Sequence, residues 1–183
     1  MNNRAVHQKY PNLSAKKLRR AFFNRATTTV ACDLLGKLLI LGNFHGIITE
    51  TEAYRGMDDE ASHAHRGLTQ RSGIMFGPPG FSYVYLIYGR YSCFNIVTEA
   101  KGQPGAVLIR GLQLITPSHE LLDGPGKLCQ ALGINRLDNG RDLMTDQAFY
   151  LCEGMKVSGY QATPRIGISK ARDKLWRYIL IPA

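Results

Sequence analysis

The stretch FSYVYLIYGRYSCFNIV, Phe81–Val97, is dense in aromatic and β-branched residues, which are the types that favour strands. The pair Gly89–Arg90 interrupts it once, so the stretch predicts two antiparallel strands joined as a hairpin. Strand alternation places Tyr83 and Tyr85 on one face, where Tyr83 is expected to be an ordinary packed aromatic. Tyr88 then lies beside a cation near the exposed tip, a position from which an aromatic ring can wedge between base pairs.

Further strand-like runs lie on both sides of this hairpin. Lys37–Leu41 and Gly46–Tyr54 predict two strands that are separated by the turn residues Gly42–Asn43. Ala106–Leu114 predicts another strand, and the C-terminal third is strand-like in pieces, ending at Leu175–Ile181. Most of the expected strands are therefore neighbours in the sequence.

Short helices are expected around these strands. The sequence predicts one that begins at Ser14 and carries Leu18, Phe22 and Phe23, one over Ala26–Leu35 closed by Gly36, one over Asp58–His65, and one around Lys127–Leu132. The mixture of helices and neighbouring strands predicts a single α+β domain over residues 13–183. Residues 1–12 are expected to form a basic N-terminal tail.

Basic side chains outnumber acidic ones in the 183 residues, 23 Lys and Arg against 14 Asp and Glu, for a formal net charge of +9. This charge favours a polyanionic partner such as nucleic acid, although a basic protein without one is the alternative. The N-terminus is polar and no apolar run reaches about 18 residues, so we expect no secretory signal and no membrane span. The four cysteines form no Cys-x-x-Cys pair, which favours thiols in a reducing cytoplasm over a zinc framework.

The segment ETEAYRGMDDEASHAH, Glu50–His65, carries the clearest chemical signal. In a strand Glu50, Glu52 and Tyr54 share one face, which is unusual for a face packed into a core. A partly buried carboxylate beside an aromatic ring is a reasonable general base, because burial tunes its pKa. The alternative is an edge strand whose acidic face is solvated.

A second group in this segment invites a metal interpretation. It consists of Asp58, Asp59, Glu60, His63 and His65. Di-metal helical sites repeat a Glu-x-x-His motif on a second helix, and this sequence has no such repeat. Acidic residues at the start of a helix are equally explained by the helix dipole, so we expect no metal.

Seven segments in register resemble the alkyladenine (3-methyladenine) DNA glycosylase family. They are ETEAY, the acidic segment with its histidine, MFGPPG, YVYLIYG, the Asn-Ile of the returning hairpin strand, LIRGL and DGPGKLCQALGI. The resemblance runs from about Leu13 to the RIGIS and WRYI segments. It implies a single mixed domain with a curved antiparallel sheet flanked by helices and a protruding hairpin. It also implies no metal, and excision of alkylated or deaminated purines from double-stranded DNA. We expect no cofactor, and we expect a monomer because one compact domain would grip the duplex.

The resemblance assigns the reacting groups to a few positions. Glu52 matches the family's water-activating base. Arg110 matches a residue near the catalytic water and the phosphate of the flipped nucleotide. Tyr88, at the hairpin tip, matches the residue that fills the gap left in the duplex.

The resemblance also assigns the pocket that would hold the extruded base. Tyr54, His63 and Tyr85 match positions that line this pocket and stack on the base. Asn95 matches the position that disfavours normal guanine through its exocyclic amine. Ala61 matches a position whose backbone carbonyl lies close to the base.

One loop departs from the family pattern. The family commonly shows Arg-Asn before the Met-Phe pair, whereas this chain has Gln70-Arg71-Ser72-Gly73. We expect the change to alter loop packing and DNA contacts while leaving the pocket positions untouched. The connection between Arg110 and Asp123 is short, which predicts a reduced DNA-contacting excursion there.

The sequence predicts simple hydrolysis. No lysine in the matching motifs is placed to form a Schiff base with the sugar, so an abasic site without strand cleavage is the expected product. The lesion remains open among 3-methyladenine, 7-methylguanine, hypoxanthine and ethenoadenine. A metal-dependent nuclease and a non-catalytic basic nucleic-acid-binding protein are the alternatives.

Overall fold

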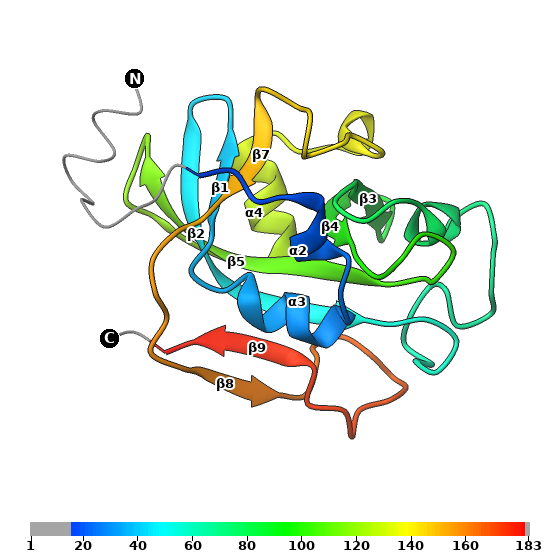
Figure 1. Cartoon of the computed structure of the whole chain (residues 1–183). Helices are drawn as coiled ribbons and strands as arrows, with labels where there is room; N and C mark the ends of the chain where they lie inside the picture. Colours follow the sequence, from blue (N-terminus) through cyan, green and yellow to red (C-terminus); the bar gives the residue numbers. More distant parts are fainter. Residues whose placement is uncertain (1–15, 182–183) are drawn as a thin grey trace.

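A computed structural model describes residues 16–181 of the chain. Within them, one antiparallel sheet of nine strands curls into a half-barrel (Figure 1). The strands are β1 (Leu38–Leu41), β2 (Phe44–Tyr54), β3 (Ser82–Ile87), β4 (Tyr91–Val97), β5 (Ala106–Thr116), β6 (Leu121–Asp123), β7 (Phe149–Cys152), β8 (Tyr160–Thr163) and β9 (Arg177–Leu180). The main order is β3-β4-β5-β2-β1-β7, while β6 pairs with β5 and β9 pairs with both β2 and β8.

Short helices accompany the sheet. They are the α-helices α2 (Arg20–Phe23), α3 (Thr27–Asp33) and α4 (Pro125–Leu132), and the 3₁₀ helices η1 (Gly73–Phe76) and η2 (Arg136–Asp138). Helix α3 packs against β2 and β5, and α4 packs against β4 and β5. Gly133 ends α4 at φ 72°, a left-handed conformation that glycine adopts without steric cost.

Strand alternation gives the sheet two different faces. Phe94 on β4 and Ile109 on β5 join the main hydrophobic core together with buried residues of the three helices. On the other face, Val97 and Ala106 form a smaller cluster with Met75, which comes from the long segment 55–81. Helices therefore cover one face of the sheet, and the segment between β2 and β3 packs on the other.

A row of paired residues crosses this second face. Tyr83 lies opposite Asn95, Asn95 opposite Leu108, and Leu108 opposite Glu52. Directly opposed residues on antiparallel strands project from the same face. The pairing of β3, β4, β5 and β2 therefore brings residues from three distant parts of the chain to one surface.

Strand β2 changes partner along its length. Its first residues, 44–47, pair with β1, and Glu50–Glu52 pair with β9. Strand β5 follows the other edge of β2, with register shifts around Thr49 and Glu50. Such bulges bend a strand and re-aim its side chains.

Two helical predictions are wrong. The segment Asp58–His65 forms consecutive turns instead of a helix, because the Asp59 carboxylate accepts hydrogen bonds from the backbone N–H groups of Arg55 and Ala61. The helix expected from Ser14 is reduced to α2, and the preceding Leu18 is not helical and its N–H donates to Leu151 O at 2.9 Å. Ser14 and the basic tail over residues 1–12 lie outside the described residues.

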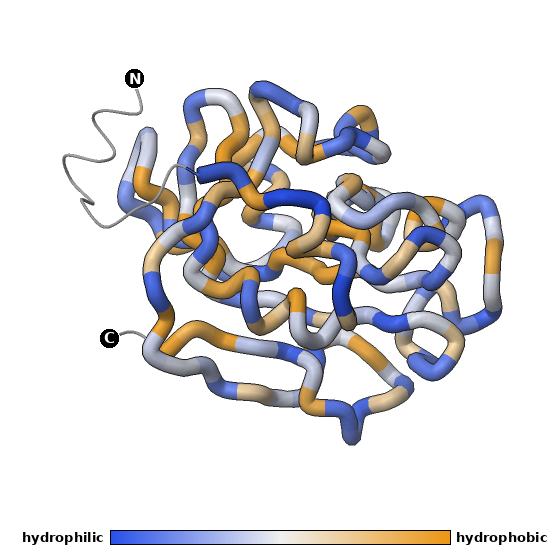
Figure 2. Tube along the Cα trace, in the orientation of Figure 1, coloured by the Kyte–Doolittle hydropathy of each residue, from blue (hydrophilic) through white to orange (hydrophobic). Residues whose placement is uncertain are grey.

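The remaining elements confirm the α+β prediction. The hairpin turns at residues 88–90, α3 lies within the predicted Ala26–Leu35, and Gly36 has φ 79°. Figure 2 shows hydrophobic stretches along the central strands and hydrophilic residues in the outer loops. All four cysteines are thiols. Among residues 16–181 no helix is long and apolar enough to cross a membrane.

Candidate active site

Glu52 is a fully buried carboxylate on the second face of the sheet. Its Oε1 accepts a hydrogen bond from the backbone N–H of Ile166 at 2.8 Å, and its Oε2 accepts one from the Tyr54 hydroxyl at 2.8 Å. Arg110 Nε lies 3.5 Å from Oε1. The alternative of a solvated acidic edge strand is therefore wrong for this residue.

The surroundings of Glu52 act on its proton affinity in opposite directions. Burial raises the pKa of the carboxyl group, because desolvation penalises the charged form. The charge of Arg110 and the hydrogen bonds from Ile166 and Tyr54 lower the pKa and offset part of this effect. The result is a carboxylate that is held in place, screened from water and more basic than an exposed glutamate.

Arg110 connects Glu52 to a second carboxylate. The register between β2 and β5 shifts beside Glu50, and Arg110 falls between paired positions there. Its Nε donates to Glu50 Oε1 at 2.9 Å, and Arg177 Nε donates to the same oxygen. The negative charge of Glu50 thus offsets the positive charges of Arg110 and Arg177, and its hydrogen bond holds Arg110 close to Glu52.

A small aromatic cavity of about 20 Å³ adjoins Tyr54. It is lined by Tyr54, Ala61, His63, Met75, Tyr83, Tyr85, Asn95 and Ala106. All five predicted base-contacting residues are among them, so the structure brings these positions together. A cavity of this size holds about one water molecule, so the walls must separate before a purine can enter.

The His63 ring packs edge to face against the Tyr83 and Tyr85 rings, which are tilted by 42° to each other. The His63 ring lies 4.6 Å from the Tyr85 ring at an interplanar angle of 78°, and the Tyr83 and Tyr85 rings are 5.2 Å apart. His63 Nδ1 and the Tyr83 hydroxyl are hydrogen-bonded at 2.8 Å. Burial and the charge of Arg71 lower the pKa of His63 to about 4, so the ring is neutral at physiological pH.

Asn95 and Ala61 are held by their local surroundings. The side-chain Nδ2 of buried Asn95 donates to the backbone oxygens of Tyr83 and Cys93 at 3.1 and 3.3 Å. The N–H of Ala61 donates to Asp59 Oδ1 at 3.2 Å. Both residues are therefore fixed before any ligand binds.

An ion pair that the sequence does not reveal supports the site. Arg165 and Asp59 are joined by two hydrogen bonds, at 2.6 and 2.7 Å, with both side chains fully buried. The same guanidinium donates to Ala53 O at 2.8 Å and lies over the Tyr54 ring, 4.6 Å from its centroid. Ile166 follows Arg165 in the chain and donates its N–H to Glu52, while Ala53, the acceptor for Arg165, follows Glu52. The Arg165–Asp59 pair therefore holds the backbone on both sides of the carboxylate. No local sequence signal joins positions 106 residues apart.

Residues 21–182 match the sequence profile of the methylpurine-DNA glycosylase family. The chain belongs to this family. A relative from Wolbachia pipientis subsp. Culex pipiens (strain wPip) is 57% identical over 161 residues, or 88% of each chain. One from Rickettsia peacockii (strain Rustic) is 55% identical over 164 residues, or 89% of each chain. Both are named, provisionally, 3-methyladenine DNA glycosylase. Membership makes this chain a hydrolase acting on N-glycosyl bonds.

The possible metal ligands of this methylpurine-DNA glycosylase do not converge. Asp58 pairs with Arg55, Asp59 with Arg165 and Glu60 with Lys170. His63 is bonded to Tyr83, and His65 Nδ1 lies 2.7 Å from Met57 O. Within residues 16–181 no three His, Cys, Asp or Glu side chains are grouped to hold a metal ion.

Tyr88 lies apart from the pocket of the glycosylase, at the hairpin tip. Its side chain is 91% exposed, and its backbone has φ 51°, in the left-handed region that residues other than glycine rarely adopt. A large aromatic ring presented to solvent in a strained turn has no packing role within the described chain. The position is the one predicted for a wedge.

The loop that departs from the family pattern does reach the pocket. The guanidinium of Arg71 lies over the Tyr85 ring, 5.1 Å from its centroid, and its charge lowers the pKa of His63. The prediction that this loop leaves the pocket positions untouched is therefore wrong. Tertiary contacts, which the spacing of residues in the sequence does not reveal, place this loop against the sheet.

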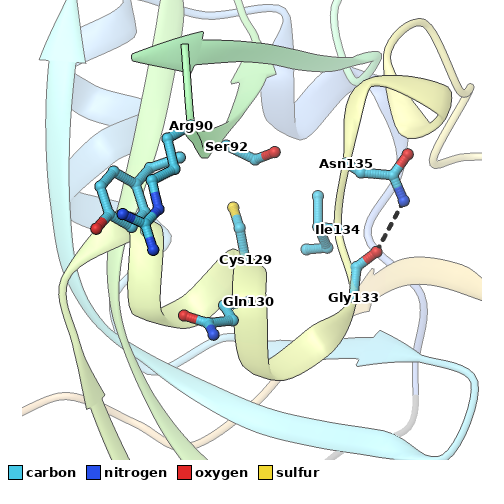
Figure 3. A pocket seen from close by; sticks show the side chains of 9 residues that line it. Arg90, Ser92, Cys129, Gln130, Gly133, Ile134 and Asn135 are labelled. Atoms are coloured by element: carbon cyan, nitrogen blue, oxygen red, sulfur yellow. Dashed lines mark hydrogen bonds between the residues drawn. The ribbon is translucent and has the colours of Figure 1, made fainter. Parts of the chain in front are cut away.

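A larger cavity, of about 430 Å³, lies between the start of β4 and helix α4. Figure 3 shows the Cys129 thiol pointing into it and the Asn135 side chain turned toward Gly133 O, a hydrogen bond of 3.0 Å. Burial raises the pKa of Cys129 to about 12, so this thiol is protonated and unreactive. The cavity shares no lining residue with the pocket beside Glu52.

Proposed function

We propose that this methylpurine-DNA glycosylase flips damaged purines out of duplex DNA and hydrolyses the N-glycosidic bond with a water activated by Glu52. The observation that carries the proposal is the buried Glu52 carboxylate, bonded to Tyr54 at the edge of an aromatic pocket. The candidate lesions are 3-methyladenine, named for the relatives, and 7-methylguanine, hypoxanthine and ethenoadenine. The enzyme acts as a monomer, through residues 13–183.

Access to the glycosidic carbon requires base flipping. A purine inside the duplex shields this carbon, and unstacking it costs a few kcal/mol, less for a damaged or mispaired base. Tyr88 at the exposed hairpin tip fills the gap and offsets part of the lost stacking. The net charge of +9 supports binding to the phosphate backbone irrespective of sequence.

The pocket recognises the base mainly by stacking. Tyr54 and Tyr85 supply aromatic faces, and such stacking is worth about 1–3 kcal/mol per base. The fixed Asn95 side chain disfavours the 2-amino group of normal guanine. Ala61 lines the same cavity from the segment between β2 and β3, and its backbone carbonyl serves as an acceptor for the edge of the base.

Bond cleavage needs one carboxylate. As the C1′–N bond breaks, its electron pair leaves with the purine and the sugar becomes oxocarbenium-like. Glu52 stabilises this positive charge and takes a proton from the water whose oxygen attacks C1′. A cationic alkylpurine leaves directly, whereas a neutral purine takes up a proton on leaving. Arg110, whose Nε lies 3.5 Å from Glu52 Oε1, fixes the carboxylate and, in this proposal, contacts the nucleotide phosphate.

The direct test uses duplex oligonucleotides that contain a single hypoxanthine or ethenoadenine. We expect the wild-type enzyme to release the base with EDTA present, and strand breaks to appear only after alkali. Retained activity in EDTA separates this function from a metal-dependent nuclease, and base release separates it from a non-catalytic binder. If the wild type releases neither base nor 3-methyladenine, the proposed function is wrong.

Tyr88→Ser tests the wedge. We expect about a tenfold loss in affinity for lesion duplex, because the gap left by the flipped base is no longer filled. Flipping is followed by the fluorescence of 2-aminopurine placed beside the lesion. Met155→Ser removes another exposed apolar side chain, on the segment after β7, and should leave affinity unchanged. Unaltered binding and fluorescence in Tyr88→Ser would contradict the assignment of Tyr88 as the wedge.

A further inference from the structure

The guanidinium of Arg71 adds a permanent positive charge beside the base pocket. It lies over the Tyr85 ring, 5.1 Å from the centroid, and its charge opposes the burial that raises the pKa of Tyr83. The Tyr83 hydroxyl is in turn 2.8 Å from His63 Nδ1. Three pocket residues are therefore coupled to one cation.

The charge of Arg71 also acts on His63. Burial and the charge of Arg71 lower the pKa of His63 to about 4, which keeps the imidazole neutral. The His63 ring therefore adds no charge of its own to the pocket.

We propose that Arg71 is a specificity-determining residue that favours neutral purines over cationic alkylpurines. This inference rests on the proposed function and concerns the substrate class of the same pocket. A cationic base is repelled by the guanidinium and must share the Tyr85 ring with it. A neutral base meets neither penalty.

The expected selectivity is measurable as a ratio. We expect Arg71→Gln to raise kcat/KM for 7-methylguanine relative to kcat/KM for hypoxanthine by about fivefold, the size of one cation–π contact and a screened charge repulsion. Both lesions are placed in the same duplex sequence and assayed at the same salt concentration. Any general loss of DNA affinity cancels in the ratio.

Two further variants make the result specific. Arg71→Lys keeps the charge and should stay within about twofold of the wild-type ratio, since the repulsion persists. Arg66→Gln removes one charge from an exposed position on the same segment and should lower both rates equally. A ratio in Arg71→Gln within twofold of wild type, or an equal shift in Arg71→Lys, overturns the proposal.

The failure of this inference is distinct from failure of the proposed function. If the wild type releases neither base, the glycosylase assignment of the pocket fails and no ratio of kcat/KM values can be measured. If the wild type releases both and the ratio is insensitive to Arg71, only the specificity role fails. The pKa of His63 from NMR titration provides a readout independent of catalysis, and it should rise in Arg71→Gln as the neighbouring charge is removed.

Discussion

Glu52→Gln is expected to lower the rate of base release by about 1,000-fold while leaving DNA binding intact, because the amide cannot take a proton from water. The substitution preserves shape: the Gln oxygen still accepts from Ile166 N–H, and the amide group can donate to the Tyr54 oxygen. Single-turnover release of hypoxanthine measures the loss. Retention of most of the activity would refute the proposed mechanism.

The matched control for this variant is Glu60→Gln. Glu60 carries the same group on the surface, 56% exposed and 3.7 Å from Lys170, and should keep wild-type activity. The Glu52 variant should also be no less stable than the wild type near neutral pH. Burial raises the pKa of Glu52, so its ionised form disfavours folding above that pKa, and the amide removes the penalty.

The pH profile of the wild type provides a second measurement on Glu52. The proposed mechanism requires the ionised carboxylate, so kcat/KM should fall as the pH decreases through the pKa of Glu52. Since burial raises this pKa, the acidic limb should lie above the range of an exposed glutamate. An acidic limb at the pH of an ordinary glutamate would show that a different group limits the reaction.

Asp59→Asn is expected to have the largest effect on stability, about 3–5 kcal/mol. It leaves the Arg165 guanidinium buried without its counter-charge, which is far more costly than the net value of an intact pair. Denaturation in urea, followed by circular dichroism, measures the change. Asp58→Asn is the neighbouring control, because its pair with Arg55 is exposed and worth less than about 1 kcal/mol.

A double variant separates the two contributions of this pair. Asp59→Leu with Arg165→Met replaces both charges by apolar groups and should recover much of the stability lost in Asp59→Asn. Activity should remain low, because the cation over Tyr54 and the anchor of Ala61 are both gone. Equal denaturation midpoints for Asp58→Asn and Asp59→Asn would contradict the assignment of Asp59 as the buried partner.

The sequence predicts the elements whose signal is local. The hairpin over Phe81–Val97 follows from its alternation and its Gly89 turn, and the ETEAY strand from its period of two. The helix predicted over Asp58–His65 is wrong, because Asp59 is committed to Arg165 and to backbone donors of its own loop. Long-range pairing outweighs local helical propensity there.

The site is predictable only as far as motifs identify its members. Glu52, Tyr54 and Tyr85 stand out by residue type and spacing, and the family resemblance adds His63 and Asn95. Their convergence depends on the register across β3, β4, β5 and β2, which no single segment contains.

Two supporting residues lack even that local signal. Arg165 and Arg71 look like ordinary surface arginines in the sequence, yet one is fully buried against Asp59 and the other lies over Tyr85. Their roles depend on contacts between segments far apart in the chain.

The closed pocket has a consequence for how the enzyme searches DNA. A cavity of about 20 Å³ cannot receive a purine until His63, Tyr85 and their neighbours separate. Under the proposed function, a normal base that leaves the stack briefly would return before the rings part. A lesion with weakened pairing stays outside the helix longer and would outlast this delay. The resting pocket would then select bases by the lifetime of their extrahelical state, before any contact tests their chemistry.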